Sequence, residues 1–156
     1  DVCPGNKVFL PVNVPGAMFH IGDGHAAQGD GEVCGVATEI PTRGTFTFEL
    51  IKENPIGTPR IESNEFIMAV GSARPMEDAA RIAFYELILW LEQDYGIDRL
   101  TGYQLCSQVA RVRLANMVDI LYSVVAKFPK KYLPLGDWGG ERWTTNRLYT
   151  YTGILL

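Results

Sequence analysis

Five side chains that can ligate a metal or move a proton lie within ten residues of this sequence: Asp23, His25, Gln28, Asp30 and Glu32. Residues two apart in an extended backbone point to the same side, so Asp23 and His25 share one face, and Asp30 and Glu32 share another. The residues between the two pairs are small and let the chain turn, and the glycines permit close approach of backbone to a ligand. We therefore predict that the two pairs converge on one site. The surrounding glycines are Gly22, Gly24, Gly29, Gly31 and Gly35.

Carboxylates held close together repel one another, and burial adds a desolvation cost, so such a cluster needs a compensating charge. A divalent cation supplies that charge. A histidine with two carboxylates is a ligand set of catalytic zinc, whereas oxygen-rich ligation suits calcium. The pattern predicts Asp23 and His25 as ligands, completed by Glu39, by Asp30 or by a ligand outside this chain. The expected cofactor is a divalent metal ion, zinc in the first place and calcium as the alternative; the acidic spacing does not fit an EF-hand.

Each of these residues also has a plainer interpretation. A segment rich in glycine and aspartate is most often a surface loop, and Glu39 is then simply solvated. His20 lies in an apolar run and is expected to be a core or edge residue. Cys34 is either a nucleophile beside His25 or a buried thiol.

Apolar runs and alternating β-formers predict strands through the first seventy residues. The expected strands cover residues 8–12, 17–21, 45–51 and 61–70. The glycines and prolines between these segments are typical of a compact sheet with tight turns.

The pattern changes at Pro75, where acidic residues and a stripe of apolar residues predict a helix that ends at Gly96. A second helix is expected over residues 100–110. Segment 111–128, rich in Val, Leu and Ile, fits either a helix or strands, and strands at 111–114 and 124–128 are favoured. Strands first and helices later predict an α+β fold. Its N-terminal part is expected to be β-rich, as a sandwich-like or barrel-like sheet, followed by an α+β part with two helices.

Composition limits the classes of partner. A chain of 156 residues with 47% hydrophobic residues can bury one core. The net charge of −4 argues against nucleic acid as a partner, and the sequence has neither a run of eighteen apolar residues nor a secretory signal, which argues against a membrane. Three irregularly spaced cysteines suggest reduced thiols and a cytoplasmic location.

The run LPVNVPGAMFHIGDGHAAQGDGEVCGVATEI, at residues 10–40, resembles the signature region of the acetamidase/formamidase family. Weaker resemblance continues to about residue 133, so we expect a family-like domain over 1–133 and an aromatic-rich tail over 134–156. Family members are about twice as long, and this chain resembles their C-terminal half. The resemblance implies homo-oligomers, and the N-terminal half is a possible partner as a separate chain.

The resemblance also implies hydrolysis of a short aliphatic amide, such as formamide or acetamide, to carboxylate and ammonia. In that reaction a cation held by Asp23 and His25 would activate water and polarise the carbonyl. Glu32 is the expected general base, Asp30 a further catalytic group or ligand, and Gln28 or backbone N–H groups would hold the carbonyl oxygen. The alternative is a non-catalytic module that keeps the fold and binds an ion or a glycan.

Overall fold

The computed structural model describes residues 1–134 and 153–155. A five-stranded antiparallel sheet has the order β1-β3-β4-β6-β5, and a two-stranded ribbon pairs β2 with β7. The α+β class is confirmed, with strands leading and helices following. The elements are β1 (Lys7–Phe9), β2 (Arg43–Thr45), β3 (Arg60–Glu62), β4 (Phe66–Ala73), α1 (Met76–Tyr95), α2 (Arg99–Val109), β5 (Arg111–Asn116), β6 (Tyr122–Pro129), a 3-10 turn (Lys130–Tyr132) and β7 (Gly153–Leu155).

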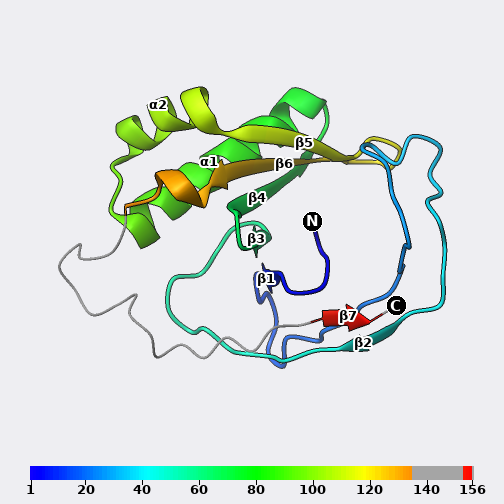
Figure 1. The fold of residues 1–156 in the computed structure, drawn as a ribbon. Helices are drawn as coiled ribbons and strands as arrows, with labels where there is room; N and C mark the ends of the chain where they lie inside the picture. The colour runs from blue at the N-terminus through cyan, green and yellow to red at the C-terminus, as the bar shows by residue number, and fades with distance from the viewer. Residues whose placement is uncertain (135–152, 156) are drawn as a thin grey trace.

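The two helices lie on the same face of the sheet (Figure 1). Helix α1 ends as predicted at Gly96, which adopts the left-handed conformation and donates its N–H to the Glu92 carbonyl. Helix α2 begins after Asp98, whose side chain accepts the N–H of Thr101 at 3.1 Å. Both helix predictions and the strands β5 and β6 are confirmed, with bounds that differ by one to two residues.

The main core lies between α1 and the central strands. Gly71 of β4 allows this close packing, because a Cβ there would lie 2.0 Å from the Ala79 carbonyl oxygen of α1. A smaller cluster of Ile61, Met68 and Val125 lies apart from it. The buried residues of the main core are Ile67, Ala69, Ala83, Leu87, Trp90, Leu91, Cys106, Ala126 and Phe128.

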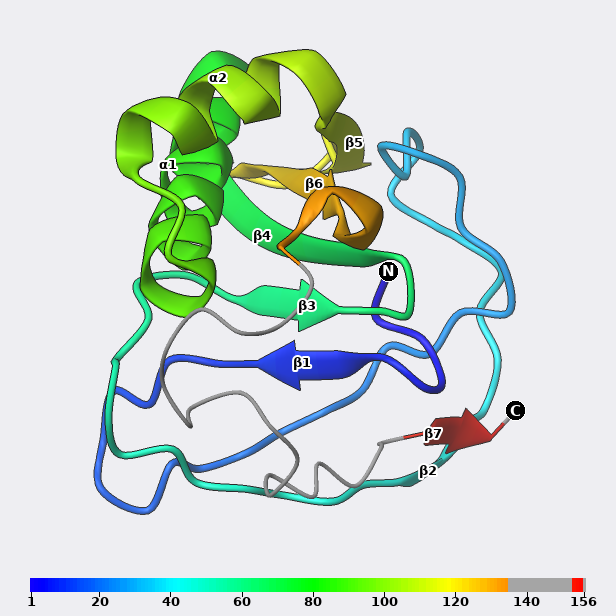
Figure 2. The same ribbon diagram turned by 60° about the vertical axis from the view of Figure 1, so that its left-hand side comes forward.

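The β-strand predictions for the first sixty residues are largely wrong. No strand forms over 17–21, and of the segment 45–51 only Thr45 belongs to a strand. The expected strands at 8–12 and 61–70 become the shorter β1 and the pair β3–β4. Figure 2 shows the chain between β1 and β3, apart from the short β2, as long loops beside the sheet.

These loops expose apolar side chains that the predicted strands would have buried. Phe19 and Phe48 remain 43% and 65% exposed although their rings lie 4.7 Å apart. A strand needs a hydrogen-bonding partner and a covering layer, and the described part of the chain gives these residues neither. We refer to residues 8–21 and 46–51 as the apolar arm. Its exposed side chains are Val8, Leu10, Val12, Val14, Met18, Phe19, Ile21, Phe48, Leu50 and Ile51.

Among the described helices, none combines the length and the apolar character that crossing a bilayer requires. The aromatic residues of the predicted tail, 138–151, lie outside the described residues.

Candidate functional site

A short antiparallel ladder between residues 24–27 and 38–40 places His25 directly opposite Glu39. Backbone hydrogen bonds flank the pair on both sides, from Ala26 N–H to the Thr38 carbonyl and from Ile40 N–H to the Gly24 carbonyl. This is the non-hydrogen-bonded type of cross-strand pair, in which the two side chains lie closest. The ladder therefore brings an imidazole and a carboxylate together.

Three predicted ligands meet at this ladder. His25 Nε2 lies 2.9 Å from Glu39 Oε1 and 3.2 Å from Asp23 Oδ1. One ligand atom from each of the three side chains lies within 4.8 Å of the others. The His25 side chain is only 11% exposed, whereas those of Asp23 and Glu39 are 80% and 51% exposed. The cluster is therefore open to solvent on its carboxylate side.

The backbone before the histidine is specialised. Asp23 has a φ of 61°, in the left-handed region that non-glycine residues seldom adopt. Gly24 follows it, and a Cβ at Gly24 would lie 2.1 Å from the Thr42 Cγ2 methyl. An unusual backbone conformation held in place by its surroundings often accompanies a functional site. Here it turns the Asp23 carboxylate back toward the imidazole two residues later.

Strand β5 supports the loop formed by residues 22–35. Gly31 donates its N–H to the Leu114 carbonyl and accepts the N–H of Met117, both at 2.9 Å. Gln28 donates its side-chain amide to the Ala115 carbonyl at 3.2 Å, and its Oε1 lies 2.9 Å from His25 Nδ1. Figures 1 and 2 both show the loop meeting the far end of the β5–β6 hairpin. The Gln28 side-chain amide and the Gly31 backbone thus both tie the site to the sheet.

The electrostatics of the cluster favour positive charge at its centre. The hydrogen bond to Gln28 raises the pKa of His25 above its ordinary value. The carboxylates of Glu39, Asp23 and Glu32 raise it further, while desolvation acts in the opposite direction. A proton on Nε2 or a cation in its place can balance the two facing carboxylates.

The donor set fits a divalent cation. One imidazole nitrogen with two carboxylates is a known zinc ligand set, and carboxylate oxygens also suit calcium. Two ligands of a tetrahedral zinc lie roughly 3.3–3.6 Å apart. His25 Nε2 lies 2.9 and 3.2 Å from the two carboxylate oxygens, and all three ligand atoms lie within 4.8 Å of one another. The residues that would hold the ion are Asp23, His25 and Glu39.

The two acids of the second pair differ in where they lie: Glu32 is close enough to His25 to raise the pKa of the imidazole, whereas Asp30 is engaged with a strand residue. Asp30 forms an ion pair with Arg113 of β5, which also lies 3.9 Å from Asp1. Glu32 has a φ of 45°, and its carboxylate accepts the Asn116 amide at 3.3 Å. The two acids flank Gly31, whose backbone bonds to Leu114 and Met117, so both side chains come within reach of β5. Arg113 and Asn116 were not foreseen because they lie more than eighty positions away in the sequence.

The two other candidates lie apart from the cluster. Cys34 is exposed, and its thiol donates to the Val36 carbonyl at 3.4 Å, so the prediction of a buried thiol is wrong. His20 is exposed and lies outside any strand, which corrects its placement as a core or edge residue.

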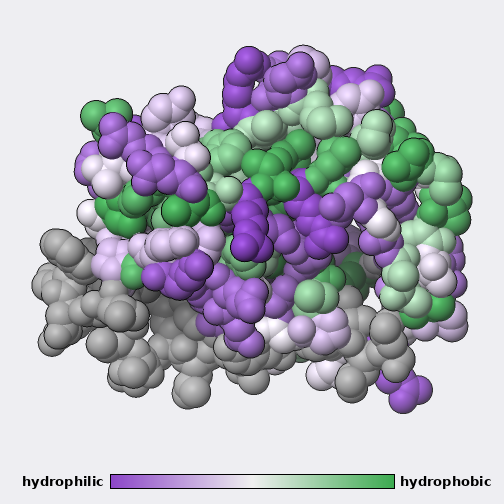
Figure 3. Space-filling view, turned by 45° about the horizontal axis from the view of Figure 1, so that its top comes forward, coloured by the Kyte–Doolittle hydropathy of each residue, from purple (hydrophilic) through white to green (hydrophobic). Residues whose placement is uncertain are grey.

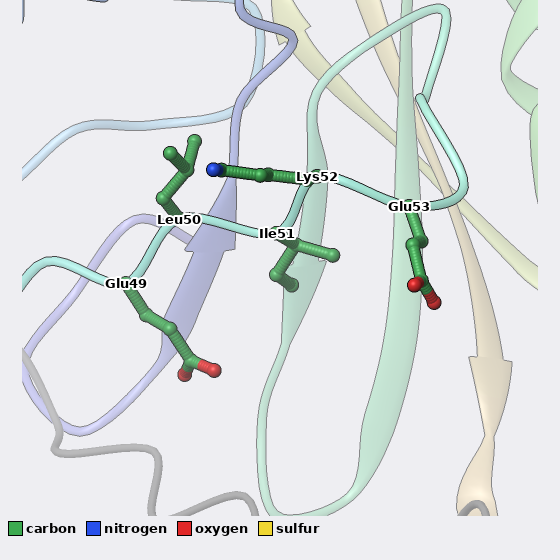
Figure 4. Close-up of a pocket in the computed structure, with 5 residues that line it drawn as sticks. All are labelled: Glu49, Leu50, Ile51, Lys52 and Glu53. Carbon is green, nitrogen blue, oxygen red and sulfur yellow. The ribbon is translucent and has the colours of Figure 1, made fainter.

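Two surface hollows contain none of the three clustered residues. One, of about 250 Å³, is lined by residues 49–53, whose side chains alternate along a single extended segment (Figure 4). The other, of about 550 Å³, lies between the end of α1, the start of α2 and residues 131–134. Neither combines a histidine with acids, so the His25 cluster remains the place where the described residues can do chemistry.

Comparison with known proteins agrees with the sequence resemblance. The model of the acetamidase/formamidase family matches residues 1–133. A crystal structure of acetamidase from Yersinia enterocolitica has 45% identity and a TM-score of 0.76, covering 84% of this chain and 40% of that chain. The structure of a recombinant predicted acetamidase/formamidase from Thermoanaerobacter tengcongensis has 26% identity and a TM-score of 0.69, covering 81% and 42%. A candidate formamidase from Schizosaccharomyces pombe is 52% identical over 50 residues, which are 31% of this chain and 12% of that protein.

The matched parts cover 40%, 42% and 12% of these relatives, so the chain spans only part of the length of each.

Proposed function

The chain belongs to the acetamidase/formamidase family, and from that premise we propose that it carries the cation site of an enzyme that hydrolyses a short aliphatic amide. The observation that carries the proposal is the meeting of His25 Nε2 with the Asp23 and Glu39 oxygens, inside the sequence run that resembles the family signature. The products are a carboxylate and ammonia. Formamide and acetamide are the proposed substrates, and zinc is the proposed ion, with calcium as the alternative.

A bound divalent cation supplies Lewis acidity and lowers the pKa of water. Asp23, His25 and Glu39 hold and orient it. Glu32 is the proposed general base: it takes a proton from the attacking water and returns it to the departing nitrogen. Its carboxylate is close enough to His25 to act on the imidazole pKa, and Asn116 fixes one of its oxygens.

The structure leads us to assign different roles to the two other predicted catalytic groups, Asp30 and Gln28. Asp30 is engaged with Arg113, so we assign it to holding the loop on β5 rather than to the cation. The side-chain amide of Gln28 already contacts His25 and the Ala115 carbonyl. We therefore assign the hydrogen bonds to the carbonyl oxygen of the substrate to backbone N–H groups of the glycine turns.

The exposed carboxylate side of the cluster and the apolar arm support a further partner. We propose that the remaining part of the family fold, on the same or a separate polypeptide, covers the apolar arm and encloses the amide. Assembly into a homo-oligomer is the companion proposal. Native mass spectrometry tests both: a second polypeptide or a multiple of 17.3 kDa supports them, and a lone monomer opposes them.

Ammonia release from formamide and acetamide tests the activity itself. His25→Ala should abolish both turnover and zinc binding, whereas His20→Ala is the matched control, because His20 is the other histidine and is exposed outside the site. Equal turnover in the His25→Ala variant and the unaltered protein would exclude the proposed site.

Zinc binding without ammonia release, both in this chain and in the assembled protein, would instead support the second candidate, a non-catalytic ion-binding module. The specific observation in its favour is the 80% exposure of the Asp23 side chain, which leaves the cluster accessible but unenclosed.

A further inference from the structure

The side chain of Gln28 joins the candidate site to the sheet. Its Nε2 lies 3.2 Å from the Ala115 carbonyl oxygen of β5, and its Oε1 lies 2.9 Å from His25 Nδ1. Gln28 therefore touches the imidazole on the side opposite to the two carboxylates. No role in binding the cation itself is open to it in this geometry.

The partner on β5 decides which end of the amide faces the imidazole. A backbone carbonyl can only accept, so the NH₂ group of Gln28 must face Ala115 and the oxygen must face His25. The reverse orientation would place two acceptor oxygens against each other and lose a hydrogen bond. An oxygen at 2.9 Å requires a hydrogen on His25 Nδ1.

A hydrogen on Nδ1 fixes the other nitrogen of a neutral imidazole. Its Nε2 then carries a lone pair, and that lone pair faces Asp23 and Glu39 at 3.2 and 2.9 Å. Three electron-rich atoms that face one another need a positive charge between them, which either a proton on Nε2 or a bound cation supplies. The tautomer set by Gln28 is thus the one in which all three atoms act as ligands.

Resting on the proposed cation site, we propose that Gln28 is a positioning residue that holds His25 as the Nδ1–H tautomer and aims Nε2 at the ion. The chain of contacts runs from the β5 backbone through one amide to one imidazole. Partners that orient a ligating histidine in this way typically change metal affinity 10–100-fold when removed.

Two variants separate this role from simple packing. Gln28→Met keeps the length of the side chain and removes both hydrogen bonds. Gln28→Glu keeps an oxygen that accepts from Nδ1 and gives up the bond to Ala115. Gln104→Met is the matched control, because Gln104 is an exposed glutamine on α2, away from the site.

The experiment uses the whole protein with zinc alone. Calorimetric titration measures zinc affinity, thermal unfolding checks that each variant is folded, and ¹⁵N NMR of the zinc-loaded protein reports the His25 tautomer. We expect Nδ1–H in the unaltered protein, a 10–100-fold loss of zinc affinity in Gln28→Met, and affinity within about tenfold of the unaltered protein in Gln28→Glu. A purely structural role would not move the tautomer signal.

The outcomes are distinct. A loss of zinc affinity in Gln28→Met of less than tenfold, or zinc on Nδ1 with hydrogen on Nε2, overturns the role of Gln28 and leaves the cation site standing. A folded, unaltered protein that binds no zinc and no calcium overturns the cation site and this inference together.

Discussion

Gly31 offers the sharpest test of how the site is held, because it is the point where the loop attaches to β5. Its φ is +83°, and its N–H and carbonyl both bond to the strand and its continuation, at Leu114 and Met117. We predict that Gly31→Ala detaches this loop or destabilises the whole domain.

Two separate costs add at this position. A side chain in the left-handed region costs about 1–2 kcal/mol. The new methyl would lie 3.2 Å from Met117 Cγ and 3.3 Å from Leu114 Cδ2, and overpacking of this kind costs about 1–3 kcal/mol. The expected sum is about 2–5 kcal/mol, which lowers the melting temperature of a domain of this size by roughly 5–15 °C.

Urea denaturation measures the global part of this loss, and hydrogen exchange of the Met117 amide, which bonds to the Gly31 carbonyl, measures the local part. Gly29→Ala is the matched control, since a Cβ at Gly29 meets nothing within 4 Å and its φ is not positive. That control should stay within about 0.5 kcal/mol of the unaltered protein.

A Gly31→Ala protein with an unchanged urea midpoint and unchanged protection of Met117 would refute the reasoning. In that case the loop would not depend on β5, and the support given to Gln28 and His25 would have to come from elsewhere.

Three further outcomes follow from the structure. Glu32→Gln should lower kcat for formamide by about 10²–10⁴-fold with an unchanged melting temperature, measured by ammonia release and calorimetry; full turnover would dismiss it as the base. Gly71→Ala should cost at least about 3 kcal/mol in urea denaturation because α1 must move away; an unchanged midpoint would contradict this packing. Iodoacetamide at pH 8 should label exposed Cys3 and Cys34 but not Cys106, because burial raises the pKa of Cys106 to about 11; mass spectrometry of the native protein decides.

Local sequence signals are sufficient to predict an element when its apolar face packs against other parts of this chain. The helix after Pro75 was predicted from its acidic first turn, its apolar stripe and Gly96, and each of these acts within a few residues. The Val, Leu and Ile residues of 111–128 favour strands over a helix, and β5 and β6 form there because they are neighbours in sequence that pair with each other.

Pairings across the sequence had no local signal. Asp30 finds Arg113 at a separation of 83 residues, and Gln28 finds Ala115 at 87. The spacing of the acids predicts that the two pairs converge, but it carries no information about a basic side chain, Arg113, on a distant strand. The ion pair with Arg113 neutralises Asp30 locally, so the loop can hold it away from the cluster.

The failed strands and the open cluster have the same physical origin. Alternating apolar residues such as Phe46 and Phe48 indicate a strand only if a second layer covers one face and a neighbour supplies hydrogen bonds. The described chain covers the inner side of His25 through β5 but leaves Asp23 and Glu39 exposed. Apolar side chains also gather on the right-hand margin of the surface in Figure 3. The exposed apolar residues of the site loop and of the β5–β6 turn include Val33, Val36, Val118 and Ile120. Water at an open cluster weakens every charge interaction in it. The proposed amide hydrolysis would therefore need a second surface over the carboxylates, and we expect the exposed apolar residues to be where it attaches.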